Sequence, residues 1–459
     1  MKFNIIGNQF FNAINKLNYV IPSRSVLPIL ENIMFELRGN VLKLLASDLE
    51  IFIRTKVEVE GIEDGEIAVP SKDLINLIRT LSSNLQVTET IPNFGADMIS
   101  EELRTYDLFI EKFKIDFGKK QLILKGLITQ EEKDRLINIA ANEIIEEAID
   151  NLYIKFEEFS KHNKISVIAN EKNKITVKTK KGKYTLSGES TEEFPAPEEK
   201  EDLNKIEFNN INFRKYLSTT IHAASTDDLR KNMAGILLDI RGKDIRMVAT
   251  DGFRLCKYTT QKAKHKISKS EKVIIPHKTC SLILKLSEGE KSVIEFDSSM
   301  IKVIFDSTEI FSKLIDENFP NYETVIPKDN DKILKINRRD FQESLERIKI
   351  FADESTHRIK LEIKNSELNI KADNPEKGAE GEDSLDCSFI KNDSQDADFD
   401  AEPFNIAFNA GYLLECIKQI NTDDVIFSFS TTSKASIATP SEQEGDEEYM
   451  ELVMPVRVG

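Results

Sequence analysis

Residue types that could do chemistry are few in this chain and lie far apart. The most motif-like run is Thr250-Asp251-Gly252-Phe253-Arg254-Leu255, where the Asp could accept backbone amides and the Gly could adopt a left-handed turn. The sequence has no GxxxxGK(S/T) loop, GxGxxG turn, HExxH helix or GxSxG elbow. We therefore expect no catalytic residue, and a strand-ending turn is the simpler interpretation of residues 250–255.

Metal-ligating residue types are also scattered. The five histidines stand singly and the four cysteines form no CxxC pair, so we expect buried free thiols rather than a disulfide or a zinc site. Asp396, Asp398 and Asp400 have the start of a calcium-loop spacing, but Ala401 stands where such a loop needs Gly. An acidic, partly disordered hairpin tip over 376–402 accounts better for these aspartates. We expect no metal and no cofactor.

The elements that must position these residues recur three times along the chain. In each copy a helix-patterned stretch containing a Phe is followed by a strand hairpin that ends in a small residue and Asp. The three pairs are Phe10 with Asp48, Phe213 with Asp251, and Phe341 with Asp373. A second marker closes the first two copies, at Phe194-Pro195 and Phe319-Pro320. The repeat predicts one ancestral domain in three copies, over residues 1–201, 202–330 and 331–459.

Alternating apolar and polar residues between the helical stretches predict antiparallel hairpins. Their turns fall at Gly39-Asn40, Lys181-Gly182, Gly242-Lys243 and Asn365-Ser366. Each copy should therefore be an antiparallel sheet layer with two helices packed on its inner face, which is an α+β fold. The 459 residues, of which 40% are hydrophobic, are enough for three such cores. No run is apolar enough for a membrane span, so a cytoplasmic protein without a membrane partner is expected.

Positive charge is concentrated on the predicted helices. Six segments have helical apolar spacing, two in each copy, at 8–20, 71–82, 211–224, 276–287, 337–352 and 409–420. Together they carry twelve Lys or Arg and five Asp or Glu, a net +7 in a chain whose net charge is −16. A solvated face is the simplest interpretation of any one helix, but the same bias in all six argues for a shared function.

A block of residues, from about 85 to 163, interrupts the first copy. Without them the spacing from Asp48 to Asp251 matches the spacing from Asp251 to Asp373, so the block is an insertion. Thr129 to Glu132 resembles a capping box that opens a long amphipathic stretch ending near Leu152, which predicts a small, mainly helical subdomain. Its excess of acidic residues disfavours direct contact with DNA. A solvated appendage and a protein-docking surface both remain open.

Several motifs occur together in the order of one known family. They are Met1-Lys2-Phe3, Leu27-Pro28-Ile29-Leu30, Ala46-Ser47-Asp48-Leu49-Glu50, Val248 to Leu255, Asn318 to Tyr322, and Val453-Met454-Pro455-Val456-Arg457. With them the chain resembles the bacterial DNA polymerase III beta subunit family, the sliding clamps, over all three copies outside the insertion. The resemblance implies a head-to-tail homodimeric ring whose helices surround double-stranded DNA. It also implies that the polymerase III catalytic subunit, the clamp loader and other clamp-binding-motif proteins are partners.

The resemblance assigns roles to individual residues. Arg24 and Lys72 match DNA-contacting positions, and Arg230 and Lys231 lie in the other DNA-facing loop of the family. We assign the basic helix residues Arg79, Arg214, Lys215, Lys278, Arg338 and Arg339 to the same ligand. The pocket for partner peptides would contain Met233, Thr250, Gly252, Phe253, Arg254, Leu255, Pro320, Thr324, Val325, Val453, Met454, Pro455, Val456 and Arg457. The dimer interface would pair Ile350 and Phe351 of one subunit with the strand of Tyr184 and Leu186 of the next.

Two other functions fit part of the sequence. A protein-interaction scaffold of the same fold would keep the pocket without ever encircling DNA. An enzyme would need a polar site around the turn at 250–254, the one candidate position for it.

Overall fold

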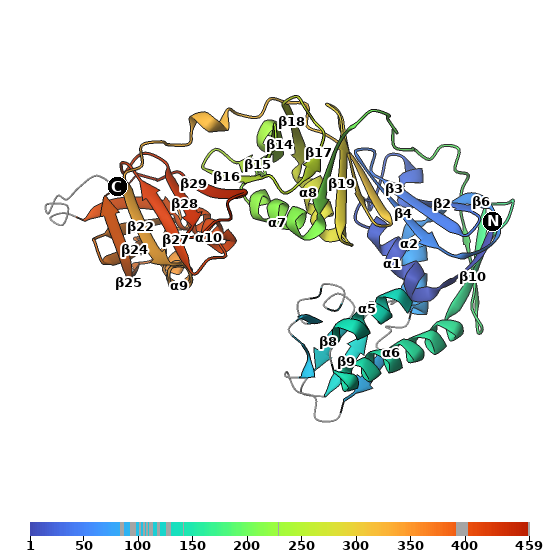
Figure 1. Ribbon diagram of the computed structural model, residues 1–459. Helices are drawn as coiled ribbons and strands as arrows, with labels where there is room; N and C mark the ends of the chain where they lie inside the picture. The colour runs from blue at the N-terminus through green and yellow to red at the C-terminus, as the bar shows by residue number, and fades with distance from the viewer. Residues whose placement is uncertain are drawn as a thin grey trace. The chain divides into compact units, whose positions relative to one another are not determined.

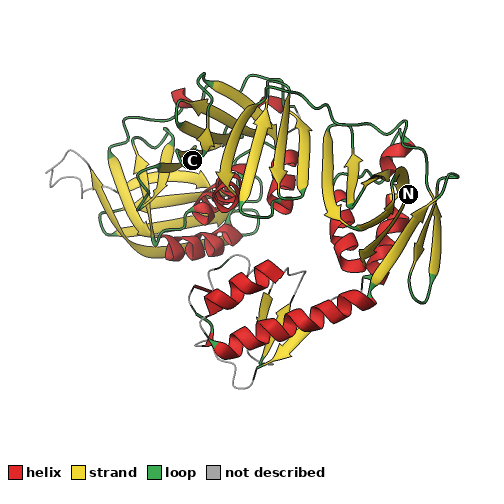
Figure 2. Cartoon of the chain, turned by 45° about the vertical axis from the view of Figure 1, so that its right-hand side comes forward, coloured by secondary structure: helices red, strands yellow, loops and turns green. Residues whose placement is uncertain are grey.

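The computed structural model describes residues 1–82, 87–91, 98–100, 102–103, 106, 109, 113–116, 120–124, 130–140, 142–227, 229–391 and 403–457. The chain forms two compact units, shown by residue number in Figure 1 and by secondary structure in Figure 2. The first unit is Met1–Glu198 with Ser307–Ile310, and the second is Glu199–Asp306 with Phe311–Gly459. Thr129, Asp396, Asp398 and Asp400, which the sequence singled out, lie outside the described residues.

The first unit packs two helices against antiparallel strands. Strands β12, β11, β10, β1 and β5 follow one another in one sheet, and β4, β3, β2 and β6 in another. Helix α1 packs against both α2 and β4. The bounds are β1 Lys2–Ile6, α1 Gly7–Leu17, η1 Pro28–Glu31, β2 Asn32–Arg38, β3 Val41–Ser47, β4 Ile51–Glu58, β5 Glu60–Glu63, β6 Gly65–Pro70, α2 Ser71–Leu81, β10 Lys164–Ala169, β11 Lys174–Lys178 and β12 Lys183–Ser187.

The insertion has a hydrophobic core of its own. It contains β7 Val87–Thr90, β8 Phe113–Asp116, β9 Gln121–Leu124, α5 Gln130–Ala140 and α6 Glu143–His162. Leu122 and Leu124 of the three-stranded sheet β7-β9-β8 share this core with Leu136, Ile149 and Leu152 of the two helices. The predicted single amphipathic stretch is two helices, because the Asn142 side chain accepts the amides of Ile144 and Ile145 and starts α6 anew. The subdomain is therefore mixed, with a sheet that the sequence did not predict.

Both ends of the insertion meet at Gly7, the first residue of α1. Its amide donates to the carbonyl oxygen of Asn163 at 3.2 Å. A Cβ atom at Gly7 would lie 3.5 Å from the carbonyl oxygen of Leu81 and 3.8 Å from that of Asn163. The two carbonyl oxygens therefore lie close to each other, because the distance between them is at most the sum of these two. The insertion thus leaves and re-enters the first unit at one narrow neck.

We expect the chain to fold without the insertion. Replacement of residues 83–162 by a flexible linker of about four residues, which spans roughly 13 Å when extended, closes the neck without moving α2 or β10. The melting temperature of the shortened protein should stay within about 5 °C of the full chain, because the insertion's core is separate. Differential scanning calorimetry measures this. An insoluble or unfolded shortened chain would show that the insertion belongs to the core of the first unit.

One continuous sheet of the second unit contains strands of both the second and the third repeat. The strand order is β18-β14-β15-β16-β29-β28-β27-β22-β25-β24-β23-β26, so β16 of the second repeat pairs with β29 of the third. The second repeat has β13 Asn204–Asn209, α7 Asn210–Ile221, η3 Lys231–Met233, β14 Gly235–Arg241, β15 Asp244–Thr250, β16 Arg254–Thr260, β17 Lys264–His265, β18 Glu271–Pro276, α8 His277–Leu286, β19 Lys291–Phe296, β20 Met300–Phe305, β21 Thr308–Lys313 and η4 Tyr322–Thr324. The third has β22 Lys332–Asn337, α9 Arg338–Ile348, η5 Lys349–Phe351, β23 Arg358–Ile363, β24 Glu367–Asn374, β25 Ala379–Lys391, β26 Phe404–Asn409, α10 Ala410–Gln419, β27 Asp424–Phe429, β28 Ser436–Pro440 and β29 Glu447–Val453.

All six predicted helices of the repeats and the four predicted hairpins are confirmed. Three of the helices begin at an Asn whose side chain accepts two backbone amides of the first turn, at Asn209, Asn337 and Asn409. In α2 the apolar positions Leu74, Ile75 and Ile78 are buried, which is the amphipathic pattern expected of a helix packed on a sheet.

Two further predictions need correction. Residues 379–391, assigned to a partly disordered tip, form the regular strand β25, in which exposed acidic side chains alternate with half-buried residues. The four cysteines are free as predicted, but Cys387 is partly exposed rather than buried. Among the described residues no group of His, Cys, Asp and Glu is arranged to hold a metal ion.

Candidate functional site

The turn between β15 and β16 has the geometry that its sequence requires. The Thr250 hydroxyl donates to the carbonyl oxygen of Arg254 at 2.7 Å, and one Asp251 carboxylate oxygen accepts the amides of Phe253 and Arg254 at 2.9 and 3.0 Å. Gly252 has a φ of +90°, where a side chain is strained. This hydrogen bonding holds Phe253 outward, with 51% of its surface exposed.

Tyr412, the first aromatic residue of α10, completes the surface that Phe253 presents. The two rings stack with centroids 6.0 Å apart, and the Arg254 guanidinium lies 4.8 Å from the centre of the Tyr412 ring. Arg254 is buried between Asp251 and Glu415, and although burial opposes its charge, the two carboxylates raise its pKa. Tyr412 was not among the residues predicted from the sequence. An aromatic residue in the first turn after the Asn409 cap was the signal that could have found it.

The C-terminal segment runs alongside the same turn. In the pairing of β16 with β29, Arg254 lies opposite Val453, and the Met454 amide then donates to the carbonyl oxygen of Phe253 at 2.9 Å. Val453 is 1% exposed and Met454 38% exposed. The predicted residues at 250–255 and at 453–454 are therefore brought together, although nearly 200 residues separate them in sequence.

An apolar cluster supports this surface from below. Leu255 packs with Tyr322 and Leu452, and the Tyr322 hydroxyl donates to the buried Asp239 at 2.7 Å. Burial disfavours the Asp239 charge, but hydrogen bonds from Arg241 and Tyr322 lower its pKa. The remaining predicted pocket residues lie in short 3-10 helices, in loops and near the chain end, and all are partly or fully exposed: Met233, Pro320, Thr324, Val325, Pro455, Val456 and Arg457.

A cavity of about 330 Å³ lies on another side of the turn. Phe253, Arg254 and Tyr412 line it together with Arg230 and the segment 221–227. Arg230 donates to the carbonyl oxygen of Asp251 at 3.1 Å and pairs with Asp227 at 3.4 Å. A residue assigned to DNA and a residue assigned to a peptide thus share one cavity.

The basic residues assigned to DNA differ in how far they are free to bind an anion. Arg24 and Lys72 are exposed and have no ion-pair partner in the described part of the chain. Lys231 and Lys278 are exposed, and Arg339, 80% exposed, pairs weakly with Glu343. Arg79 lies over Phe11, Arg214 donates to Ser287, and Arg338 donates to Gln342.

Lys215 is held by a buried carboxylate rather than left to solvent. Its Nζ lies 3.0 Å from Glu447 of β29, which is 7% exposed and also accepts the hydroxyls of Tyr216 and Tyr258 at 2.6 Å each. Burial would raise the pKa of Glu447, but the three donors lower it to about 2. This network joins the second repeat to the third at the base of α7.

We expect Glu447→Gln to lower the free energy of unfolding by about 1–3 kcal/mol at pH 7, because it removes a charge that Lys215, Tyr216 and Tyr258 share and that also pairs with Lys262 at 3.3 Å. A depressed carboxyl pKa stabilises the fold above the unfolded-state value near 4.5 and ceases to do so as pH falls towards 2. The difference in melting temperature between wild type and variant should therefore shrink from pH 6 to pH 2.5. A pH-independent difference would assign the effect to packing instead.

Two strand edges carry the residues assigned to the dimer interface. Strand β12 forms the outer edge of its sheet, exposes 40% of Tyr184, and follows a turn rich in lysines at positions 178, 180, 181 and 183. In the third repeat, residues 379–386 of β25 pair with β24 on one side, and no strand among the described residues pairs with their other side. Ile350 is 77% exposed, and Phe351 lies against Gly381 of that edge.

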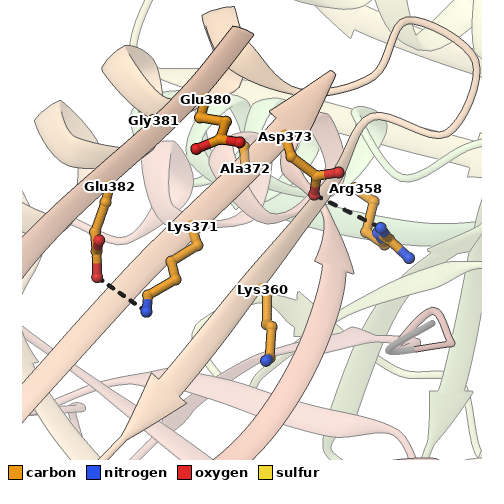
Figure 3. A pocket seen from close by; sticks show the side chains of 8 residues that line it. All are labelled: Arg358, Lys360, Lys371, Ala372, Asp373, Glu380, Gly381 and Glu382. Atoms are coloured by element: carbon orange, nitrogen blue, oxygen red, sulfur yellow. Dashed lines mark ion pairs between the residues drawn. The ribbon is translucent and has the colours of Figure 1, made fainter. Parts of the chain in front are cut away.

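The outer face beside the β25 edge holds a charged cavity of about 420 Å³ (Figure 3). Lys371 pairs with Glu382 at 3.0 Å and Arg358 with Asp373 at 3.7 Å, as the dashed lines show. These cations are matched by carboxylates, so the cavity is a poor site for an anion. Glu380 at its rim has no cationic partner among the described residues.

The described residues contain no helix that is both long and apolar enough to cross a membrane.

Three family models match in order: the N-terminal domain of the DNA polymerase III beta subunit at residues 1–105, its central domain at 207–321, and its C-terminal domain at 323–457. Proteins named Beta sliding clamp from Vibrio cholerae and Pseudomonas aeruginosa are 22% and 24% identical, with all of this chain and all of each relative aligned.

Solved structures share the fold over the whole chain. The DNA polymerase III subunit beta from Pseudomonas aeruginosa superimposes with a TM-score of 0.76 at 22% identity, and all of both chains is covered. A sliding clamp from the same organism, solved bound to griselimycin, gives a TM-score of 0.76 at 23% identity with the same coverage.

Proposed function

The chain belongs to the DNA polymerase III beta subunit family, the beta sliding clamps, and from that membership we propose that it is the processivity factor of a replicative DNA polymerase. In this role it encircles duplex DNA, slides without sequence specificity, and tethers the polymerase, the clamp loader and repair proteins. The family is one of accessory subunits, and the chain works in the cytoplasm without an active site or cofactor of its own.

The charge on the six repeat helices carries the proposal. Duplex DNA has one negative charge about every 1.7 Å, and a basic surface attracts this backbone without reading base edges. Arg24 and Lys72, which are exposed and unpaired in the described chain, are the strongest candidates for phosphate contacts. Lys215 is a weaker candidate than its sequence suggested, because Glu447 already binds it. The acidic remainder of the chain disfavours DNA elsewhere.

Two chains close the ring head to tail. The open edge of residues 379–386 carries Glu380, Glu382, Asp383 and Asp386, and the β12 edge follows four exposed lysines, so the two edges are complementary in charge and in hydrogen bonding. Ile350 and Phe351 supply the apolar part of this contact. The two surfaces differ, so the contact is heterologous and forms a closed ring if the rotation between subunits allows it.

Partner proteins bind at the surface formed by Phe253, Tyr412 and the C-terminal segment. Exposed apolar groups at Phe253 and Met454, above a rigid cluster around Leu255, suit a short peptide with apolar anchors. The flexible Met454 side chain adapts to related peptides. We also propose that the chain consists of three domains, residues 1–201, 202–330 and 331–459, and that the insertion is an addition to the first of them.

Loading on nicked circular DNA tests the function. A sliding clamp, once loaded, stays on the circle through gel filtration and leaves when the circle is cut with a restriction enzyme. A scaffold that binds partners without encircling DNA would not be retained on the circle. An enzyme would hydrolyse nucleic acid or ester substrates in the purified state, and we expect no such activity.

A further inference from the structure

The first unit repeats the register that builds the apolar cluster of the second. Met34 pairs with Leu45 and with Ala68, as Leu237 pairs with Val248 and Ile274. Phe52 lies opposite Ser47 as Leu255 lies opposite Thr250. Phe194, in the same Phe-Pro marker as Phe319, packs on this group in the first unit.

The first-unit cluster is covered less completely than its counterpart. Leu237 and Leu255 are each 2% exposed, whereas Met34 and Phe52 at the equivalent positions are partly exposed, as is Ile29 beside them. In the second unit the buried ring of Tyr322, three residues after Phe319, is part of the cluster. Pro197 stands three residues after Phe194, so the first unit has no aromatic ring at that point. The result is an apolar patch of Ile29, Met34 and Phe52.

The turn beside the patch contains a residue with a strained backbone conformation. Leu49 has a φ of +78°, close to the +90° of Gly252 at the equivalent position, and 40% of the leucine is exposed. A left-handed leucine costs about 1–2 kcal/mol, and burial of its apolar side chain does not offset this cost. Strain of this kind is retained where the surrounding structure or a ligand requires it.

The charge around the patch indicates what covers it. Glu50 lies in the same turn, and Glu192 and Glu193 directly precede Phe194. All three are exposed and have no ion-pair partner in the described part of the chain. An apolar surface with an unmatched acidic rim is complementary to a peptide that has large apolar side chains flanked by Lys or Arg.

We propose that the patch of Ile29, Met34 and Phe52 is a second docking site, which binds a short basic and apolar segment of a protein partner. It goes beyond the partner-binding surface proposed at Phe253, because it lies entirely within the first unit. One ring would then hold two chemically different peptides per subunit.

Fluorescence anisotropy with a labelled Lys-Lys-Leu-Phe-Leu-Lys-Lys peptide tests the proposal on the full-length protein in 0.15 M salt. We expect saturable binding, and about tenfold weaker binding to Glu192→Lys/Glu193→Lys and to Met34→Glu. Circular dichroism and the melting temperature check that both variants fold. The charge-reversed pair is fully on the surface, so it remains informative if Met34→Glu unfolds.

Two control variants distinguish binding at this patch from general charge attraction and from binding at the Phe253 surface. Glu58→Lys/Glu63→Lys makes the same change of charge at exposed positions of the same unit and should alter binding less than twofold. Phe253→Ala/Met454→Ala disables the surface in the second unit and should also leave binding unchanged. Equal binding of a Lys-Lys-Ser-Gly-Ser-Lys-Lys peptide, equal loss in the first control, or loss confined to the second control would each overturn the proposal.

Discussion

Ile350→Asp should convert the proposed dimer into a monomer. Ile350 is 77% exposed in the single chain, so the substitution does not disturb the core, yet it places an unpaired charge in the proposed contact with β12 of the next subunit. A buried, unpaired charge costs about 2–5 kcal/mol at an interface, which weakens the dimer roughly 30-fold to several thousand-fold. Sedimentation equilibrium at micromolar concentration measures the mass, and retention on nicked circular DNA should be lost in parallel.

Two comparisons make the result specific. Ile62→Asp introduces the same charge at another exposed isoleucine and should leave the mass unchanged. Lys181→Glu should weaken the dimer, and adding Glu380→Lys to it should restore part of the affinity, because each interface would then pair exchanged charges. An Ile350→Asp protein that remains a full dimer would rule out the proposed contact.

Removal of residues 454–459 should abolish stimulation of the polymerase and leave the ring assembled. Met454 is an exposed part of the proposed partner-binding surface, whereas Leu452 and Val453, at 2% and 1% exposure, belong to the core strand β29 and must stay. Loss of a central apolar anchor typically costs about 2 kcal/mol or more, so partner peptides should bind at least about 30-fold more weakly. Primer extension on a long single-stranded template, with and without the truncated protein, measures the effect.

Phe253→Ala is the matched single substitution. It removes the ring that stacks on Tyr412 without shortening the chain, and its effect should be similar in direction. Full stimulation by both the truncated protein and Phe253→Ala would place the partner-binding surface elsewhere. A monomeric truncated protein would instead show that the last residues contribute to assembly through the contact of Val456 with Ala407.

The fold was predictable from the sequence wherever a periodic pattern coincides with burial. Leu74, Ile75 and Ile78 recur at helical spacing and all are buried, so the helix was found from its sequence alone. The strand at 379–391 was missed because its acidic side chains alternate with small residues, and composition suggested disorder where pairing with β24 decides the structure. The sheet of the insertion was missed because its described strands are four residues long.

The candidate site was predictable only in its local part. Thr250, Asp251 and Gly252 form a turn from neighbouring residues, and such turns follow from sequence. The partnership of Phe253 with Tyr412 depends on how β16 meets β29, which no local pattern reveals. Lys215 looks like any basic helix residue until the fold brings Glu447 to it. The partners that the fold brings to a lysine, and not its residue type, decide whether it remains available to bind phosphate.

The narrow neck at Gly7 also has a kinetic consequence. Strand β1 must pair with β10, as Phe3 with Val167, and the insertion lengthens the stretch of chain between them. If the insertion folds first, its two ends are already close together. Strand β1 then finds β10 as fast as it would in a chain without the insertion. The first unit should therefore refold slowly when the insertion is still unfolded, and faster when the insertion has already formed. Hydrogen-exchange labelling during refolding would detect this difference.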